Sequence, residues 1–133
     1  MPSSSARSRS RCPRPQAILG YPRHPAGYPR IAVCPVTELE FFYSARSAAD
    51  REQGIADFRS LFGWVPVHDR AFARAWDVQG QLTSLGQHRS VGPVDLVLAA
   101  TAELHSLTLL HHDRDFGVIA NVTGQPVRWY GSG

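Results

Sequence analysis

The chain of 133 residues is 43% hydrophobic and 10% aromatic, which suits one folded domain with a sizeable core. Its two cysteines, Cys12 and Cys34, have dissimilar surroundings and no metal-ligand spacing, which argues against a disulfide framework and favours a reducing cytosol. No apolar run approaches the roughly 20 residues that a membrane helix needs, and no apolar segment follows the N-terminal arginines as in a signal peptide. We therefore expect a soluble, cytoplasmic protein.

The net charge of +3 is unevenly distributed along the chain. Residues 1–30 hold six of the 14 arginines, six prolines and no acid, whereas residues 31–133 hold eight arginines and 11 acids. Because proline removes backbone donors and apolar residues are sparse, residues 1–30 are predicted to be a largely disordered segment. An arginine-rich RNA-binding arm is the alternative interpretation, although the acidic remainder of the chain lends it no support.

Folded structure is predicted from Ile31 onward, in a domain covering residues 31–133. The short apolar run IAVC is followed by a helix over residues 36–46, whose apolar side chains recur at helical spacing. Thr37 and Glu40 have the spacing of a capping box, which would give Glu40 a structural role; the alternative is that Glu40 faces an active site. Glu38 lies about 200° from Glu40 around a helix, so it is expected in solvent.

Two more helices and a connecting strand are predicted before residue 92. Residues 64–67 are predicted to be a short strand or an extended connection, and because Pro66 has no backbone donor they lie either at a sheet edge or outside the sheet. Asp69 can cap the second helix, and Gly86 ends it. The helix over residues 50–62 is expected to bury Ile55, Phe58, Leu61 and Phe62, and the helix over residues 70–85 is expected to bury Phe72, Ala75, Trp76 and Leu82. The polar loop at residues 87–92 contains His88 and Arg89, which either contact a phosphate backbone or are simply solvated.

The stretch VGPVDLVLAATAELHSLTLLHHDRDF, residues 91–116, combines a buried helix with a buried strand. Pro93 suits the first turn of a helix that is apolar nearly all round, and residues 107–110 form an uninterrupted apolar strand. Asp95 lies at the helix start, where it either favours the helix dipole or serves an active site. Asp113 and Asp115 follow the strand, and Asp115 can instead cap the helix expected at residues 116–122.

Adjacent histidines and a last strand complete the pattern. His111 and His112 point to opposite faces of a strand, so they cannot chelate one metal ion, and core or surface roles are expected for both. A final strand is predicted over residues 125–130. Because helices alternate with short apolar strands, we predict an α/β fold with a central parallel sheet and helices on both faces.

Four carboxylates are expected to meet at the carboxyl edge of this sheet. They belong to the ends of different elements: Glu40, Asp95, Asp113 and, as the weaker candidate, Asp115. Buried acids need cationic partners, and hard oxygen ligands without thiolates suit Mg²⁺, with Mn²⁺ as the alternative. Such a site supports in-line hydrolysis of a phosphodiester.

The segments PVTELEFFYSAR, DLVLAATAELHSLTLLHHDRDF and TGQPVRW resemble the PIN domain, in the branch of small VapC-type toxin ribonucleases. The resemblance extends over residues 31–129. It implies a PIN-like three-layer sandwich and a metal-dependent endoribonuclease with Glu40, Asp95 and Asp113 in the catalytic site. It also implies inhibition by a cognate VapB-type antitoxin, an RNA substrate and a homodimer, for which the aromatic helix around Phe41 and Phe42 is a candidate contact.

One family feature has no counterpart in this sequence. PIN domains of this kind open with an apolar strand ending in an Asp that is a central metal ligand, whereas the first acid here is Glu38. The first strand is therefore expected to be missing or degenerate. Because the segment before Ile31 is dominated by Arg, Pro, Ser and Ala, we hypothesise that it is frameshifted or wrongly assigned. A catalytically inactive remnant that retains at most antitoxin binding is the alternative function.

Overall fold

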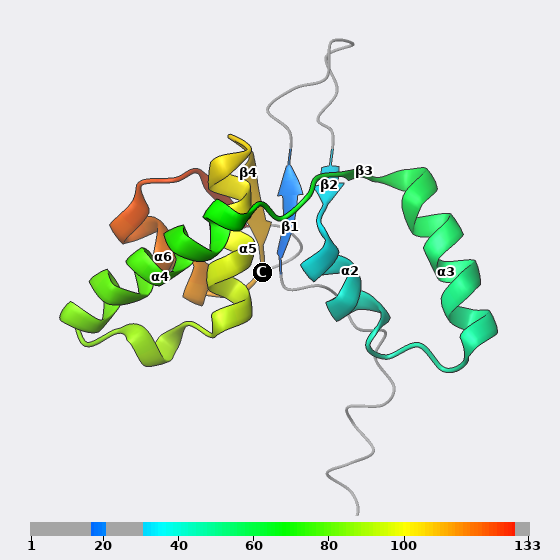
Figure 1. Cartoon of the computed structure of the whole chain (residues 1–133), viewed down its shortest axis with the longest axis horizontal. Coiled ribbons are helices and arrows are strands. Elements are labelled where there is room, and N and C mark those ends of the chain that lie inside the picture. Colours follow the sequence, from blue (N-terminus) through cyan, green and yellow to red (C-terminus); the bar gives the residue numbers. More distant parts are fainter. Residues whose placement is uncertain (1–16, 21–30, 130–133) are drawn as a thin grey trace, which may run out of the picture.

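The computed structural model describes residues 17–20 and 31–129, which fold into a five-stranded sheet with helices around it (Figure 1). The strands lie in the order β3-β2-β1-β4-β5 across the sheet. Their bounds are β1 Ala17–Gly20, β2 Ile31–Val33, β3 Gly63–Trp64, β4 Thr108–His111 and β5 Val127–Trp129. The helices are α2 Pro35–Phe42, α3 Ala48–Leu61, α4 Asp69–Ser84, the short 3₁₀ helix η1 His88–Ser90, α5 Pro93–Leu104 and α6 Asp115–Thr123.

The direction of β1 differs from that of the other strands. β2 pairs with β3 and β4 pairs with β5 in parallel, as expected, but β1 runs antiparallel to both of its neighbours, β2 and β4. A strand therefore occupies the centre of the sheet, so of the two alternatives expected for the first strand, a missing one is wrong; the strand that is present contains no acid and is reversed in direction. The backbone groups of β2 and β4 need partners there, and a short apolar segment can supply them in either direction. The predictions for residues 1–16 and 21–30 lie outside the described residues.

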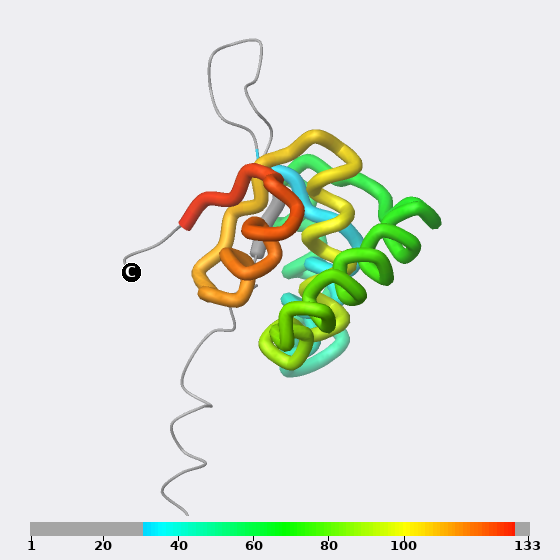
Figure 2. Tube along the Cα trace, turned by 90° about the vertical axis from the view of Figure 1, so that its left-hand side faces the viewer, coloured from blue at the N-terminus to red at the C-terminus, as the bar shows by residue number. Residues whose placement is uncertain are grey.

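The core is built on α5, which is buried on several sides. α5 packs against α4, α6 and β4, as Figure 2 shows from the side. Its buried side chains are Leu96, Leu98, Ala99, Ala100, Thr101 and Ala102. The sequence prediction of a buried helix followed by a buried strand is confirmed for this part of the chain.

Helix α4 presents a different stripe to the core from the one predicted. Its buried residues are Ala71, Ala75, Val78 and Leu82. Phe72 and Trp76 remain 57% and 79% exposed. Two alanines one turn apart let the α4 backbone approach α5 closely, which turns the neighbouring aromatic side chains outward. Phe72 and Trp76 instead line a groove of about 240 Å³ that they share with Pro93, Leu96 and Val97 of α5.

Helix α3 lies apart from α4 and α5, on the outer side of α2 (Figure 1). Phe58 is its only buried residue, and Leu61, predicted to face inward, is 74% exposed. The Phe58 ring contacts the rings of Phe41, Phe42 and Phe62 at centroid distances of 4.8, 5.4 and 4.9 Å. This aromatic cluster is the main apolar attachment of α3.

Glu38 supplies a polar link to the same region. Its carboxylate accepts hydrogen bonds from Arg59 Nε at 3.2 Å and from Trp64 Nε1 at 3.1 Å, and its side chain is only 13% exposed. The expectation that Glu38 would be solvated is therefore wrong. One side chain thereby joins α2 to α3 and to β3.

Two helix starts also differ from the predicted caps. Helix α2 begins at Pro35 after Cys34, so Thr37 lies inside the helix, where it is buried with its hydroxyl 3.6 Å from the Cys34 sulfur. The capping box is therefore absent, and Glu40 is not used in one. Helix α4 starts at Asp69 itself, after His68, with no side-chain cap.

Candidate active site

Asp95 is placed by the first turn of α5. Gly92 precedes the helix, Pro93 takes its first position, and the Asp95 carboxylate accepts a hydrogen bond from the Gly92 N–H. The side chain is half-buried, and burial is the main cause that raises the pKa of Asp95 to about 6. Repulsion from Glu40, Asp113 and Asp115 raises this pKa further, whereas the Gly92 hydrogen bond lowers it. The four predicted acids thus lie within electrostatic reach of one another at Asp95.

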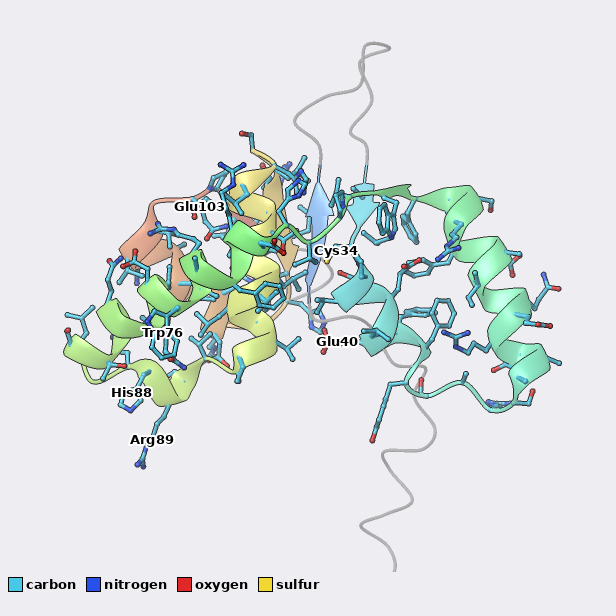
Figure 3. The ribbon with its side chains drawn as sticks, viewed as in Figure 1. Cys34, Glu40, Trp76, His88, Arg89 and Glu103 are labelled. Atoms are coloured by element: carbon cyan, nitrogen blue, oxygen red, sulfur yellow. The ribbon has the colours of Figure 1, made fainter. Side chains whose placement is uncertain are left out.

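Glu40 comes to the site from α2, which contacts α5. Figure 3 shows its side chain in the space between these two helices. Burial raises the pKa of Glu40, and its Oε1 atom is buried without a hydrogen-bond partner. A buried carboxylate oxygen without a donor is costly, so this atom is one that a cation would stabilise.

Asp113 lies in the turn between β4 and α6, and Asp115 begins α6. The Asp115 N–H donates to Asp113 Oδ1 at 3.0 Å, so the side chain that supports the start of α6 belongs to Asp113. Asp115 is the first residue of that helix, so the alternative that Asp115 caps the helix is wrong. Its pKa is raised by burial first, and then by the charge of Asp113 and their hydrogen bond. Neighbouring carboxylates therefore disfavour each other's charged forms here.

Arginine does not neutralise these acids in the described part of the chain. Its ion pairs join Arg59 to Glu38, and Arg74 to both Asp77 and Glu103. Within residues 31–129, none joins an arginine to Glu40, Asp95, Asp113 or Asp115. Among the residues that the structure describes, the site is thus a group of partly buried anions without an arginine partner.

The chemistry of this group of acids fits a divalent cation, although the acids are not arranged closely around one point. The donors are carboxylate oxygens, the unpartnered Glu40 Oε1 is among them, and the charges repel one another. Across the described residues, however, no three His, Cys, Asp or Glu side chains already stand in a metal-holding arrangement. The register pairs Ala17 at the start of β1 with His111 at the end of β4, so β1 meets this edge with its amino end. Since residues 1–30 contain no acid, they contribute no carboxylate.

His88 and Arg89 are not brought to the carboxylates. Both lie in η1, and Figure 3 shows them well away from Glu40, with Arg89 extending outward. That they contact a phosphate backbone remains a prediction. Such a contact would involve a part of the substrate that is distant from these acids.

The sequence predicts only a core or surface role for His111, but the structure places it in contact with Asp113. It is buried at the end of β4, and its Nδ1 lies 2.9 Å from the backbone oxygen of Asp113. Burial is the first cause that lowers the pKa of His111, so the ring is neutral near pH 7 and donates from Nδ1. The His-x-Asp spacing at a strand end was the sequence signal for this contact.

Comparisons with known proteins give a consistent result. The family profile described as PIN domain matches residues 17–122. Ribonuclease VapC21 of Mycobacterium tuberculosis (strain CDC 1551 / Oshkosh) is 43% identical over 99 residues, covering 74% of this chain and 72% of the relative. Ribonuclease VapC2 of the same strain is 54% identical over 99 residues, covering 71% of this chain and 68% of that relative.

A solved structure shares the fold. The crystal structure of VapBC2 from Rickettsia felis bound to a DNA fragment from their promoter contains a chain that matches with a TM-score of 0.64 and 16% identity. The match covers 77% of this chain and 76% of that one. Separately, no helix among the described residues has the length and apolar character to cross a membrane.

Proposed function

This chain belongs to the VapC-type branch of the PIN-domain family, and on that premise we propose that it is a Mg²⁺-dependent endoribonuclease acting as the toxin of a toxin–antitoxin pair. The observation that carries the proposal is the group of partly buried acids around Asp95, which lacks an arginine partner in the described structure. Asp95, Glu40 and Asp113 are the proposed ligands, with Asp115 as a weaker fourth.

Each acid has a role that follows from its position. Asp95 is held by the Gly92 N–H at the start of α5. Its negative charge is unfavourable in the folded protein, and a bound cation would offset that unfavourable free energy. Glu40 contributes the buried Oε1 atom, and Asp113 contributes a carboxylate oriented by the Asp115 N–H. Mg²⁺, or Mn²⁺ in its place, would supply charge stabilisation at the scissile phosphate and an activated water. The protein residues bind and orient, and no side-chain nucleophile is required.

The proposed partners are an RNA substrate, a VapB-type antitoxin and a second copy of the chain. The solved relative is a VapBC complex, which supports the antitoxin as partner. An antitoxin arginine placed against the carboxylates would satisfy the charges that a metal satisfies in the active protein. The rings of Phe41 and Phe42 already pack on Phe58, so exposed Leu39 and Tyr43 beside them are better candidates for a dimer contact.

A second candidate function is an inactive PIN domain that retains antitoxin binding. Two observations favour it. The amino end of β1 lies at the edge of the sheet where the acids are, and residues 1–30 contain no carboxylate that could add to them. Mg²⁺ retains several waters and needs few protein ligands, so the three remaining acids are compatible with binding. The two candidates therefore differ in catalysis and not in fold.

The deciding experiment is cleavage of structured RNA by the full chain. We expect cleavage with added Mg²⁺, none with EDTA, and at least a 100-fold loss in Asp95→Asn, as for removal of one major electrostatic contribution. Asp57→Asn, an exposed acid on α3, is the matched control and should retain full activity. Cleavage that survives Asp95→Asn contradicts the proposal. A folded wild-type chain that cleaves no RNA but binds its antitoxin supports the inactive candidate.

A further inference from the structure

We propose that His111 is a positioning residue, which sets the orientation of the Asp113 carboxylate through a hydrogen bond to the Asp113 backbone. The inference rests on the proposed function, in which Asp113 is a ligand. His111 is not among the proposed ligands. The geometry of the turn between β4 and α6 gives it a supporting role at the site.

His111 is itself firmly held. It is only 5% exposed, and its ring lies against the rings of Phe116 and Trp129 at centroid distances of 5.6 and 5.5 Å. These contacts come from α6 and from β5, so the ring is fixed by two elements besides its own strand. A side chain held in this way can act as a fixed donor.

The bond from His111 completes a set of three hydrogen bonds on one residue. Asp113 O accepts from His111 Nδ1 at 2.9 Å and from the Phe116 N–H at 3.2 Å. The Asp113 carboxylate accepts from the Asp115 N–H at 3.0 Å through Oδ1. Because the peptide group and the side chain of Asp113 are both held, the carboxylate cannot turn away without breaking one of these bonds. Removing the His111 donor leaves the Asp113 backbone oxygen with the Phe116 N–H alone, so the peptide group and, with it, the carboxylate are held less firmly.

A purely structural role for His111 makes a different prediction, and two substitutions separate the roles. His111→Asn retains an N–H close to the place of Nδ1 but removes the ring, whereas His111→Phe retains an aromatic ring but removes the donor. If His111 only fills the core, metal affinity follows stability in both variants. If it positions Asp113, the more stable Phe variant binds metal less well than the less stable Asn variant.

The measurement is Mn²⁺ binding to the full chain, followed by electron paramagnetic resonance, with thermal unfolding of each variant. We expect His111→Phe to bind Mn²⁺ about 10-fold more weakly than wild type, the low end for residues that orient a metal ligand. The Mn²⁺ affinity of His111→Asn should remain within about twofold of wild type, although its Tm is lower. The twofold margin reflects how much hydrogen-bond energies vary with context. His111→Leu, closer to histidine in volume, tests the same loss of donor if phenylalanine overfills the core.

His105 offers a matched control. Its Nε2 lies 2.9 Å from Pro66 O, a histidine–carbonyl distance equal to that of His111. His105 follows the carboxyl end of α5, whereas Asp95 lies at the amino end of that helix. His105→Phe should lower the Tm and leave Mn²⁺ affinity unchanged. Equal Mn²⁺ affinity in wild type and His111→Phe, or an affinity that follows Tm across all variants, overturns the proposal.

A metal-free readout distinguishes this inference from the proposed function. Exchange of the Asp115 amide hydrogen, which bonds to the Asp113 carboxylate, should be faster in His111→Phe and near wild type in His111→Asn. If wild type binds no Mn²⁺, the proposed metal site fails, and the positioning role of His111 is then decided by this amide alone. Unchanged exchange in His111→Phe overturns it.

Discussion

Asp95 is the residue where folding and function place opposite demands on one group. Its position in the first turn of α5 and the Gly92 N–H favour the charged carboxylate, while burial and three nearby acids disfavour it more strongly. The balance raises the pKa of Asp95 to about 6, so near neutral pH the folded chain carries an unfavourable charge. A dication at this place would turn that cost into binding energy.

Stability of the metal-free protein is therefore expected to depend on this one carboxylate. Asp95 has an ordinary pKa of 3.8 when unfolded and about 6 when folded, so stability falls as pH rises through this window and the full cost is present above it. Discounted for its partial exposure to solvent, the cost is on the order of 1 kcal/mol. Asp95→Asn retains the acceptor for the Gly92 N–H, so it should be more stable than wild type at pH 7.5 by about that amount.

Denaturant unfolding with EDTA at pH 4.5 and pH 7.5 checks this expectation. The gain in free energy of unfolding of Asp95→Asn should be fully present at pH 7.5 and fall to about a third of that at pH 4.5, which lies between the unfolded and folded pKa values. A gain that is equal at the two pH values would show that the substitution acts through packing and not through charge.

At the residue scale, the candidate acids can be picked out from the sequence, whereas long-range partners of other acids cannot. Glu40, Asp95 and Asp113 stand out in sequence as acids at the ends of apolar elements. The partners of Glu38, by contrast, are Arg59 and Trp64, which are 21 and 26 residues away. No local pattern marks a pairing over that separation, so helical geometry alone placed Glu38 in solvent.

Helix α3 shows how far an element can depend on a single buried side chain. Phe58 is its only buried residue, and Gly54 lets the helix approach Phe42, because a Cβ at residue 54 would lie 2.8 Å from Phe42 Cε1. Periodicity located the helix but overstated its apolar face, since Leu61 is turned to solvent. The same limit applies to α4, where the alanines are buried and the aromatic residues are not. Amphipathic patterns give the presence of a helix more securely than its rotation.

Phe58→Ala is expected to detach α3 without unfolding the domain. Truncation of a buried phenylalanine costs about 3 kcal/mol, and here the loss falls on a helix with few other contacts. Hydrogen exchange followed by mass spectrometry should show lost protection over α3 and unchanged protection over α5. Leu61→Ala, at a side chain 74% exposed on α3 itself, is the control and should alter neither helix. Loss of protection in α5 as well would mean that α3 is part of the cooperative core.

The whole molecule is divided by its central strand. β2 and β3 lie on one side of β1, and β4 and β5 on the other, so β1 alone joins the two halves of the sheet. The alternation of helices and strands predicts the α/β class and the parallel pairs at both edges. It does not predict the direction of β1, because AILG is apolar throughout, and a run without alternation carries no information about which way it pairs. The candidate carboxylates lie at the same edge, where β1 presents its amino end and no acid.

Two N-terminal truncations test the role of this strand. Removal of residues 1–16 retains β1 and should leave cooperative unfolding intact. Removal of residues 1–30 deletes β1 and exposes the inner edges of β2 and β4, whose unpaired backbone groups favour association with other chains. Circular dichroism melting curves should therefore show a single transition for the first truncation, and a broad transition with aggregation for the second. A sharp transition and a monomeric state after removal of residues 1–30 would mean that contacts between α2 and α5 hold the halves together without a central strand.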